Sequence, residues 1–125
     1  MNEPFRKSDR GTAAIEFALV LPVLLLFTLG IIDVGRLLWT QTTLDRAVLA
    51  AARCAAINAT TCGTTAHIQS YAVTQAYGLS ITSSAFTVTS GTGHICVSAS
   101  RTYRLIIPWV GDTLNLSANA CYPTS

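Results

Sequence analysis

Residues 17–32, FALVLPVLLLFTLGII, form an apolar run without a single charged side chain. Together with residues 12–15 the segment has about 20 residues, enough to span a hydrocarbon core of roughly 30 Å. Backbone amides in lipid need internal partners, so the run predicts a helix. Pro22 removes one helical hydrogen bond and predicts a bend. We therefore expect a transmembrane helix over residues 12–33, with Glu16 near its start.

The charges around the run predict its orientation. Three basic residues crowd the N-terminal flank: Arg6, Lys7 and Arg10. Because Lys and Arg beside a membrane span favour the cytoplasm, we expect residues 1–11 inside and everything after Asp33 outside. A cleaved secretory signal peptide is the alternative. Against it, the run is long, Glu16 is out of place, and no small-x-small cleavage site follows.

The composition agrees with a chain that partly avoids water. Charged residues are 11% of the 125 residues, and the net charge is +2, whereas a soluble globular chain carries about 25% charged residues. The charge is weakly positive, and no basic patch contains interleaved aromatic residues. We therefore expect no binding of nucleic acid.

Glu16 needs an explanation, because a carboxylate at the centre of a membrane helix costs about 2.5–3.5 kcal/mol and an acid inside such a segment indicates function. A cut after Gly11 would make Thr12 the first residue, shortly before Glu16 and Phe17. The amine of Thr12 and Glu16 of an axially staggered neighbouring copy would then attract each other strongly in a low dielectric. We therefore expect Glu16 to set the stagger at which subunits join.

A wider sequence pattern surrounds Glu16. Gly11, four further residues, the pair Glu16–Phe17 and an apolar run together resemble the processing site of type IV prepilins. Residues 10–56 are similar to the TadE-like proteins of Tad (Flp) pilus systems. The shared features are a basic residue and Gly, AAIEFAL, a proline, a Leu-rich run, DVGRLL and an Ala-rich helix that reaches Ala-Ala-Arg.

The resemblance implies a minor pilin-like subunit, or pseudopilin, of the Tad pilus machinery. A membrane aspartic prepilin peptidase would cleave it after Gly11 and remove residues 1–11 as a cytoplasmic leader. The implied partners are that peptidase, other pilin or pseudopilin subunits, the Tad inner-membrane assembly platform and the lipid bilayer. The implied location is the bacterial inner membrane or the pilus itself, with a single span, a cytoplasmic N-terminus and a periplasmic head.

The helix is expected to continue outside the membrane over residues 34–58. Apolar residues recur there with amphipathic helical spacing: Val34, Leu37, Leu38, Leu44, Val48, Ala51, Ala52 and Ala55. A helix from Thr12 to Ile57 is about 70 Å long at 1.5 Å per residue, so its outer half must pack on the C-terminal part. Asp33 and Arg36 are spaced to pair at the outer boundary, although marking the edge of the bilayer is the simpler interpretation.

Residues 59–125 predict a small β-rich head. TAHIQSYAVTQAY (65–77) favours a short helix that Gly78 ends. A period of two then predicts strands at 85–90, 94–106 and 113–122, and the last turn is marked by Pro108, Gly111 and Asp112. The expected fold class is α+β, with a long N-terminal helix packed on a small disulfide-bonded antiparallel sheet.

The four cysteines fall on the expected outer side, where disulfides persist, and they allow three pairings. If Cys96 lies opposite Cys121 in an antiparallel hairpin, one face receives apolar pairs and the other polar pairs: Ile95 with Tyr122, Val97 with Ala120, Ala99 with Ala118 and Tyr103 with Leu114, against Ser98 with Asn119. A slip by one residue spoils both faces. We therefore expect the disulfides Cys96–Cys121 and Cys54–Cys62.

Two alternatives concern chemistry and function. A metal site of the cysteines with His67 and His94 has spacings that match no zinc signature, so we expect no metal and no cofactor. Acid–base and nucleophilic schemes need a base near a nucleophile, but beyond Arg53 the sole acid is Asp112; we expect no enzyme. The rival function is a membrane-anchored extracytoplasmic binding or adhesion domain, for which the helix is an unprocessed tether.

Overall fold

The computed structural model describes residues 6–107 and 111–125, with side chains from residue 11 onward. Its elements in chain order are α1 Arg6–Ile57, α2 Thr65–Gln75, the 3₁₀ turn η1 Ser83–Ala85, β1 Phe86–Gly91, β2 His94–Arg104 and β3 Thr113–Pro123. The fold is α+β, as expected. Residues 1–5 of the expected leader and Pro108 of the expected last turn lie outside the described residues.

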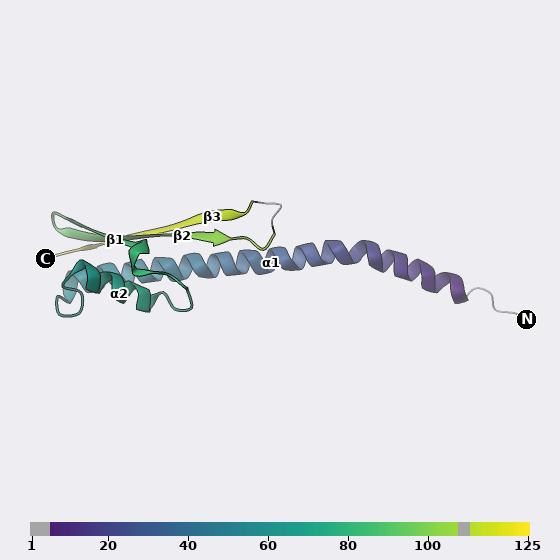
Figure 1. Ribbon diagram of the computed structural model, residues 1–125, viewed down its shortest axis with the longest axis horizontal. Helices are drawn as coiled ribbons and strands as arrows, with labels where there is room; N and C mark the ends of the chain where they lie inside the picture. The colour runs from purple at the N-terminus through teal and green to yellow at the C-terminus, as the bar shows by residue number, and fades with distance from the viewer. Residues whose placement is uncertain (1–5, 108–110) are drawn as a thin grey trace, which may run out of the picture.

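α1 dominates the shape of the molecule. It has 52 residues, which corresponds to about 78 Å at 1.5 Å per residue. It begins at Arg6, upstream of the expected Thr12, and ends at Ile57 as expected. The helix continues through Pro22 and bends in its N-terminal half, the part that contains this proline (Figure 1). A missing amide and the crowding of the proline ring against the preceding turn explain such a bend.

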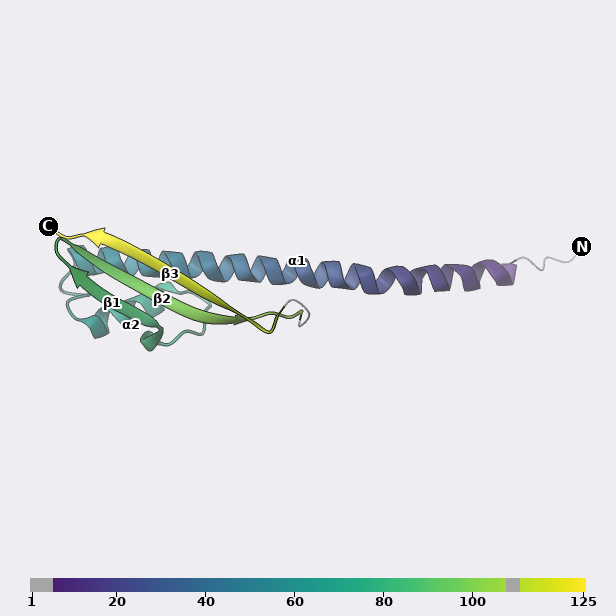
Figure 2. The same cartoon turned by 90° about the horizontal axis from the view of Figure 1, so that it is seen from above.

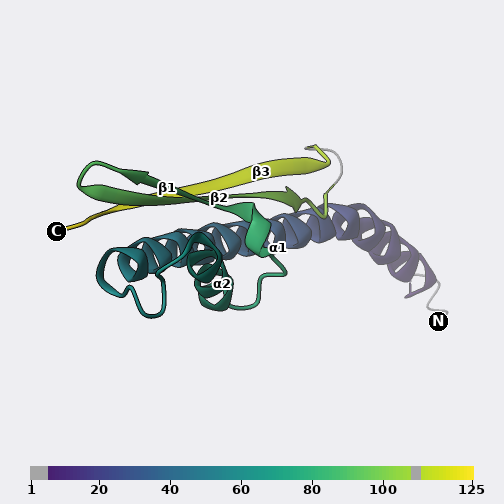
Figure 3. The same cartoon turned by 60° about the vertical axis from the view of Figure 1, so that its left-hand side comes forward.

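The sheet lies along the C-terminal half of α1, and α2 packs beside the helix (Figures 1 and 3). The three antiparallel strands of the sheet have the order β1-β2-β3. The expected register is confirmed, with Cys96 opposite Cys121 and Val97 opposite Ala120. β2 ends at Arg104 rather than at the expected Ile106, because the amides of the next residues bond to α1 instead of β3.

The core lies between α1, α2 and the inner face of the sheet. Small and branched side chains of α1 meet apolar residues of the other elements there: Leu44, Ala47, Val48, Ala51 and Ala52 against Ile68, Ala72, Phe86, Val97, Ala99, Tyr103, Leu116 and Ala118. The buried positions continue toward the N-terminus through Thr40, half-buried Leu37 and Asp33, with alternating spacings of three and four. Val34 and Leu38, expected on the packed face, fall off this seam and are exposed.

Polar contacts and one glycine fix the smaller elements. Gln41 of α1 donates its Nε2–H to the Ser117 carbonyl of β3 at 3.0 Å. α2 ends at Gln75, and Gly78 follows with a φ of +74°. A Cβ on Gly78 would lie 2.7 Å from the ring of Trp39, so the chain after α2 approaches α1 where a side chain would collide.

Candidate functional site

The first candidate site is the unpacked N-terminal half of α1, which extends away from the head (Figure 2). Within the described residues, α1 alone is long and apolar enough to cross a membrane, with a mean hydropathy of 2.5 over 18 residues. Its side chains are exposed throughout the run, Phe17 by 65% and Ile31 by 72%. Soluble monomers rarely expose such large apolar patches, so this surface requires lipid or other helices around it.

The four residues expected to carry processing and assembly all lie inside α1: Gly11, Thr12, Glu16 and Phe17. Thr12 and Glu16 are separated by one helical turn and therefore share a face. Within the described part of the chain, no hydrogen bond or ion pair reaches the exposed carboxylate of Glu16. The residues are brought together by the helix itself, and the acid is open to a partner from outside the chain.

The second candidate site joins α1 to the head. Asp33 is only 5% exposed, and its Oδ2 accepts hydrogen bonds from the backbone amides of Ile106 at 2.8 Å and Ile107 at 3.1 Å. The hydroxyl of Tyr103 approaches its Oδ1 at 3.5 Å. The Arg36 guanidinium lies over the ring of Tyr103, 5.9 Å from its centroid. We call these five residues the junction.

In the junction, Asp33 and Arg36 have other partners than each other, although their spacing would allow them to pair. The carboxylate accepts backbone amides that follow β2, and the guanidinium stacks on an aromatic ring. A buried carboxylate needs such donors, since burying a charge without hydrogen bonds is costly. The sequence signal for this was the position of Asp33 on the buried seam of α1, in register with Leu37, Thr40 and Leu44.

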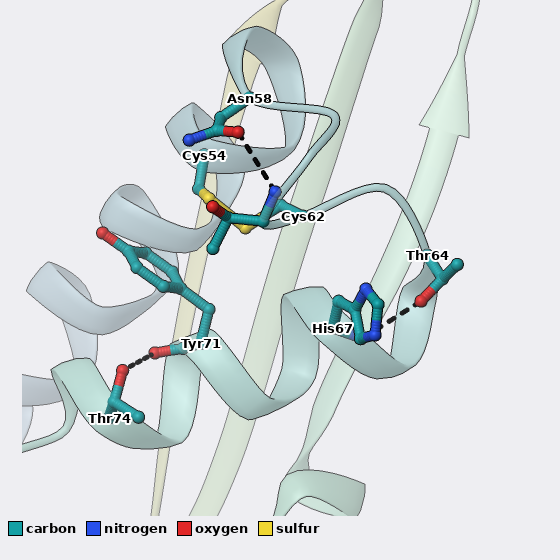
Figure 4. Close-up of a disulfide and its surroundings, with 8 residues drawn as sticks. Cys54, Asn58, Cys62, Thr64, His67, Tyr71 and Thr74 are labelled. Carbon is teal, nitrogen blue, oxygen red and sulfur yellow. Dashed lines mark hydrogen bonds between the residues drawn. A yellow bond between two sulfur atoms is a disulfide. The ribbon is translucent and has the colours of Figure 1, made fainter.

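The first disulfide lies at the C-terminal end of α1. Cys54, on the last turns of the helix, is bonded to Cys62 in the following loop (Figure 4). The Cys62 amide donates to the Asn58 carbonyl at 2.9 Å, and Asn58 Oδ1 accepts from the Thr61 amide at 3.1 Å. Thr64 then caps α2 by accepting from the His67 amide. The disulfide therefore fixes the reversal between α1 and α2.

The second disulfide joins Cys96 to Cys121 across β2 and β3, so both bonds have the pairing that the strand register predicted. No free thiol remains among the described residues, and the cysteines are not available for the alternative metal site. His67 is exposed in the first turn of α2, and exposed His94 begins β2 with its Nδ1 3.2 Å from the Thr92 carbonyl. The two histidines thus occupy surface positions.

A groove of about 530 Å³ lies beside the C-terminal end of α1. Its walls come from one stripe of α1, from the residue that follows α1, and from single residues of α2 and β3: Arg46, Leu49, Ala50, Arg53, Cys54, Ile57, Asn58, Tyr71 and Tyr122. Two arginines and two tyrosines line the groove together with apolar residues, and no acid is among its lining residues. The sequence alone does not predict this groove, because its walls are far apart in the chain.

The N-terminal part of the chain is similar to one known protein family. Residues 11–53 match the family of TadE-like proteins. This helix is TadE-like. The TadE-like match includes Glu16 and Asp33 and ends at Arg53 of α1, so α2 and the sheet lie beyond it. Such a match suggests a protein related to the Tad pilus, with partners from that system. No curated protein and no solved structure matches the chain.

Proposed function

We propose that this TadE-like chain is a minor pilin-like subunit, or pseudopilin, of Tad pilus assembly. In this proposal a prepilin peptidase cleaves after Gly11, and the subunit joins other pilin-like subunits and the inner-membrane platform through α1. One observation supports it most strongly. The carboxylate of Glu16 lies on an exposed apolar helix, and it has no partner within the described chain. A charge left alone in lipid is penalised, whereas a neighbour's N-terminal amine would neutralise it.

The proposed location is the bacterial inner membrane, with α1 crossing once and the head in the periplasm. The apolar run of α1 and the basic residues before it support this orientation. We assign the chain no catalytic role, since beyond Arg53 it carries a single acid, Asp112. Its function in this proposal is mechanical: α1 packs among other helices while the head presents its surface.

The first experiment determines the N-terminal residue of the protein recovered from membranes, with and without a co-expressed prepilin peptidase. A start at Thr12 that depends on the peptidase supports a processed pilin-like subunit. An intact Met1 under both conditions refutes processing and leaves a plain anchored domain.

The second experiment tests Glu16 with a charge-removing substitution. Glu16→Gln should insert and be cleaved normally but fail to enter the assembled pilus fraction. Asp45→Asn is the matched control, because Asp45 is an exposed acid of the same helix outside the apolar run. Normal assembly with Glu16→Gln would refute the role given to this carboxylate.

The groove favours a second candidate function, an anchored binding or adhesion head with α1 as a simple tether. Two arginines and two tyrosines beside apolar carbons suit a partner with both acidic and apolar groups. Replacing residues 1–29 with an unrelated membrane helix distinguishes the two functions, and it keeps Gly30 and Asp33, which contact the head. Function retained after this exchange favours the tether, and function lost with a folded head favours assembly.

A further inference from the structure

The segment after β2 meets α1 inside the apolar run rather than beyond it. The Ile107 side chain reaches α1 at Gly30, with its Cδ1 3.8 Å from the place where a Cβ on that glycine would be. Gly30 lies within residues 17–32, which carry no charge. β2 points toward the N-terminal half of α1, and the chain that follows it lies against the middle of the helix (Figure 1). Part of the head thus lies at the depth of the expected membrane.

The backbone amides that directly follow β2 all have hydrogen-bond acceptors, as a poorly hydrated environment requires. An amide without a partner is costly where water is excluded. The amides of Ile106 and Ile107 both donate to the buried carboxylate of Asp33. The amide of Leu105 donates to the Asp112 carbonyl at 3.4 Å. Three successive amides are therefore occupied, and the segment presents side chains instead of unpaired backbone.

The side chains of the segment match the boundary of a bilayer. Ile106 is 42% exposed. Its amide bonds to Asp33 at the end of the apolar run, and the next residue, Ile107, lies against Gly30 within that run. Two exposed arginines flank Ile106, Arg104 at the end of β2 and Arg36 at the junction. Arginines at this position can place their charge among lipid headgroups while their stems cover apolar surface. Two acids offset part of this charge: the buried Asp33 of the junction and Asp112, which is exposed near Leu105.

We propose that Ile106 and Ile107 form a second membrane contact, which enters the outer leaflet beside α1 and holds the head against the bilayer. This inference rests on the proposed membrane span of α1. The occupant is lipid, because the exposed Ile106 lies between its amide contact with Asp33 and the Ile107 contact with Gly30, at the outer end of the run that the proposed span places in lipid. A rigid head orientation follows, since α1 and the segment after β2 would enter the same leaflet side by side.

The test places one tryptophan at a time in the full chain, reconstituted in phosphatidylcholine and phosphatidylglycerol vesicles. Trp39→Phe and Trp109→Phe remove the 2 native tryptophans. Ile106→Trp reports on the segment, Phe27→Trp on the apolar run, and Thr87→Trp on the exposed side of β1. Lipids brominated near the headgroup or near the tail end quench the fluorescence according to depth.

We expect Phe27→Trp to be quenched by the tail-brominated lipid, and Ile106→Trp by the headgroup-side bromines, several-fold above Thr87→Trp. Quenching of Ile106→Trp no greater than that of Thr87→Trp, with Phe27→Trp quenched, overturns the second contact and leaves the span intact. A blue-shifted but unquenched Ile106→Trp also overturns it, since protein would then cover the site. An unquenched Phe27→Trp refutes the membrane span itself.

Discussion

Asp33 and Ile106 are 73 residues apart in the chain, yet the carboxylate of the first accepts the backbone amide of the second at 2.8 Å. The bond joins the TadE-like helix to the head at the point where the packed half of α1 begins. Because Asp33 also accepts the Ile107 amide, one side chain satisfies two donors that β3 does not pair. The end of β2 is therefore set by a residue of the helix.

Removing this carboxylate should loosen the junction. Asp33→Ala leaves both amides without an acceptor, and losing hydrogen bonds to a charged group costs about 2–3 kcal/mol in the free energy of unfolding. Denaturant unfolding in detergent measures the loss, and hydrogen exchange should show the Ile106 and Ile107 amides among the first to lose protection. Asp45→Ala, an exposed acid on the same helix, should change stability by less than about 0.5 kcal/mol. Equal effects of the two variants would contradict the importance of the junction.

Two glycines with almost the same φ angle distinguish the cost of a left-handed backbone from the cost of a steric clash with a neighbouring side chain. Gly78 has a φ of +74° and Gly93 a φ of +75°, so alanine at either position costs about 1–2 kcal/mol for its left-handed conformation. An added Cβ at Gly78 also meets Trp39, while at Gly93 it meets nothing within 4 Å. Gly78→Ala should therefore lower the unfolding midpoint more than Gly93→Ala. The difference should shrink in a Trp39→Ala background, and an unchanged difference would exclude Trp39 as its cause.

Arg101 occupies an inward-facing position of β2, opposite Leu116. Its Nη1 is buried and, within the described residues, has no hydrogen-bond partner. An unsatisfied buried donor is destabilising, and methionine keeps most of the aliphatic stem. Arg101→Met should raise the free energy of unfolding by about 1 kcal/mol. Arg104→Met, at an exposed position of the same strand, is the control and should be nearly neutral; destabilisation by Arg101→Met would show that its guanidinium has a partner in solution.

Local patterns were sufficient to predict much of this fold. The amphipathic spacing and the alanines gave the end of α1 at Ile57, and the alternation around Cys96 and Cys121 gave the strand register. Both signals are carried by neighbours in the sequence. The Asp33 contacts depend instead on how two distant segments pack. From the sequence alone, the position of Asp33 at the edge of the expected membrane already explains why an acid is there, so nothing points to a partner in the head. The groove beside Arg53 was missed for the same reason, since Tyr71 and Tyr122 reach it from other elements.

The two disulfides should differ in their resistance to reduction. Cys121 is exposed and Cys96 is half-buried on the outer face of the sheet, whereas Cys54 and Cys62 are buried in the core. Thiolate attack needs access to a sulfur atom, so increasing dithiothreitol should open Cys96–Cys121 first. Alkylation followed by peptide mass spectrometry identifies the order. After the first reduction the head should lose about 2–4 kcal/mol of stability but keep its fold through the core between α1 and the sheet. Simultaneous reduction of both pairs would mean that this core does not hold once the β2–β3 bond is open.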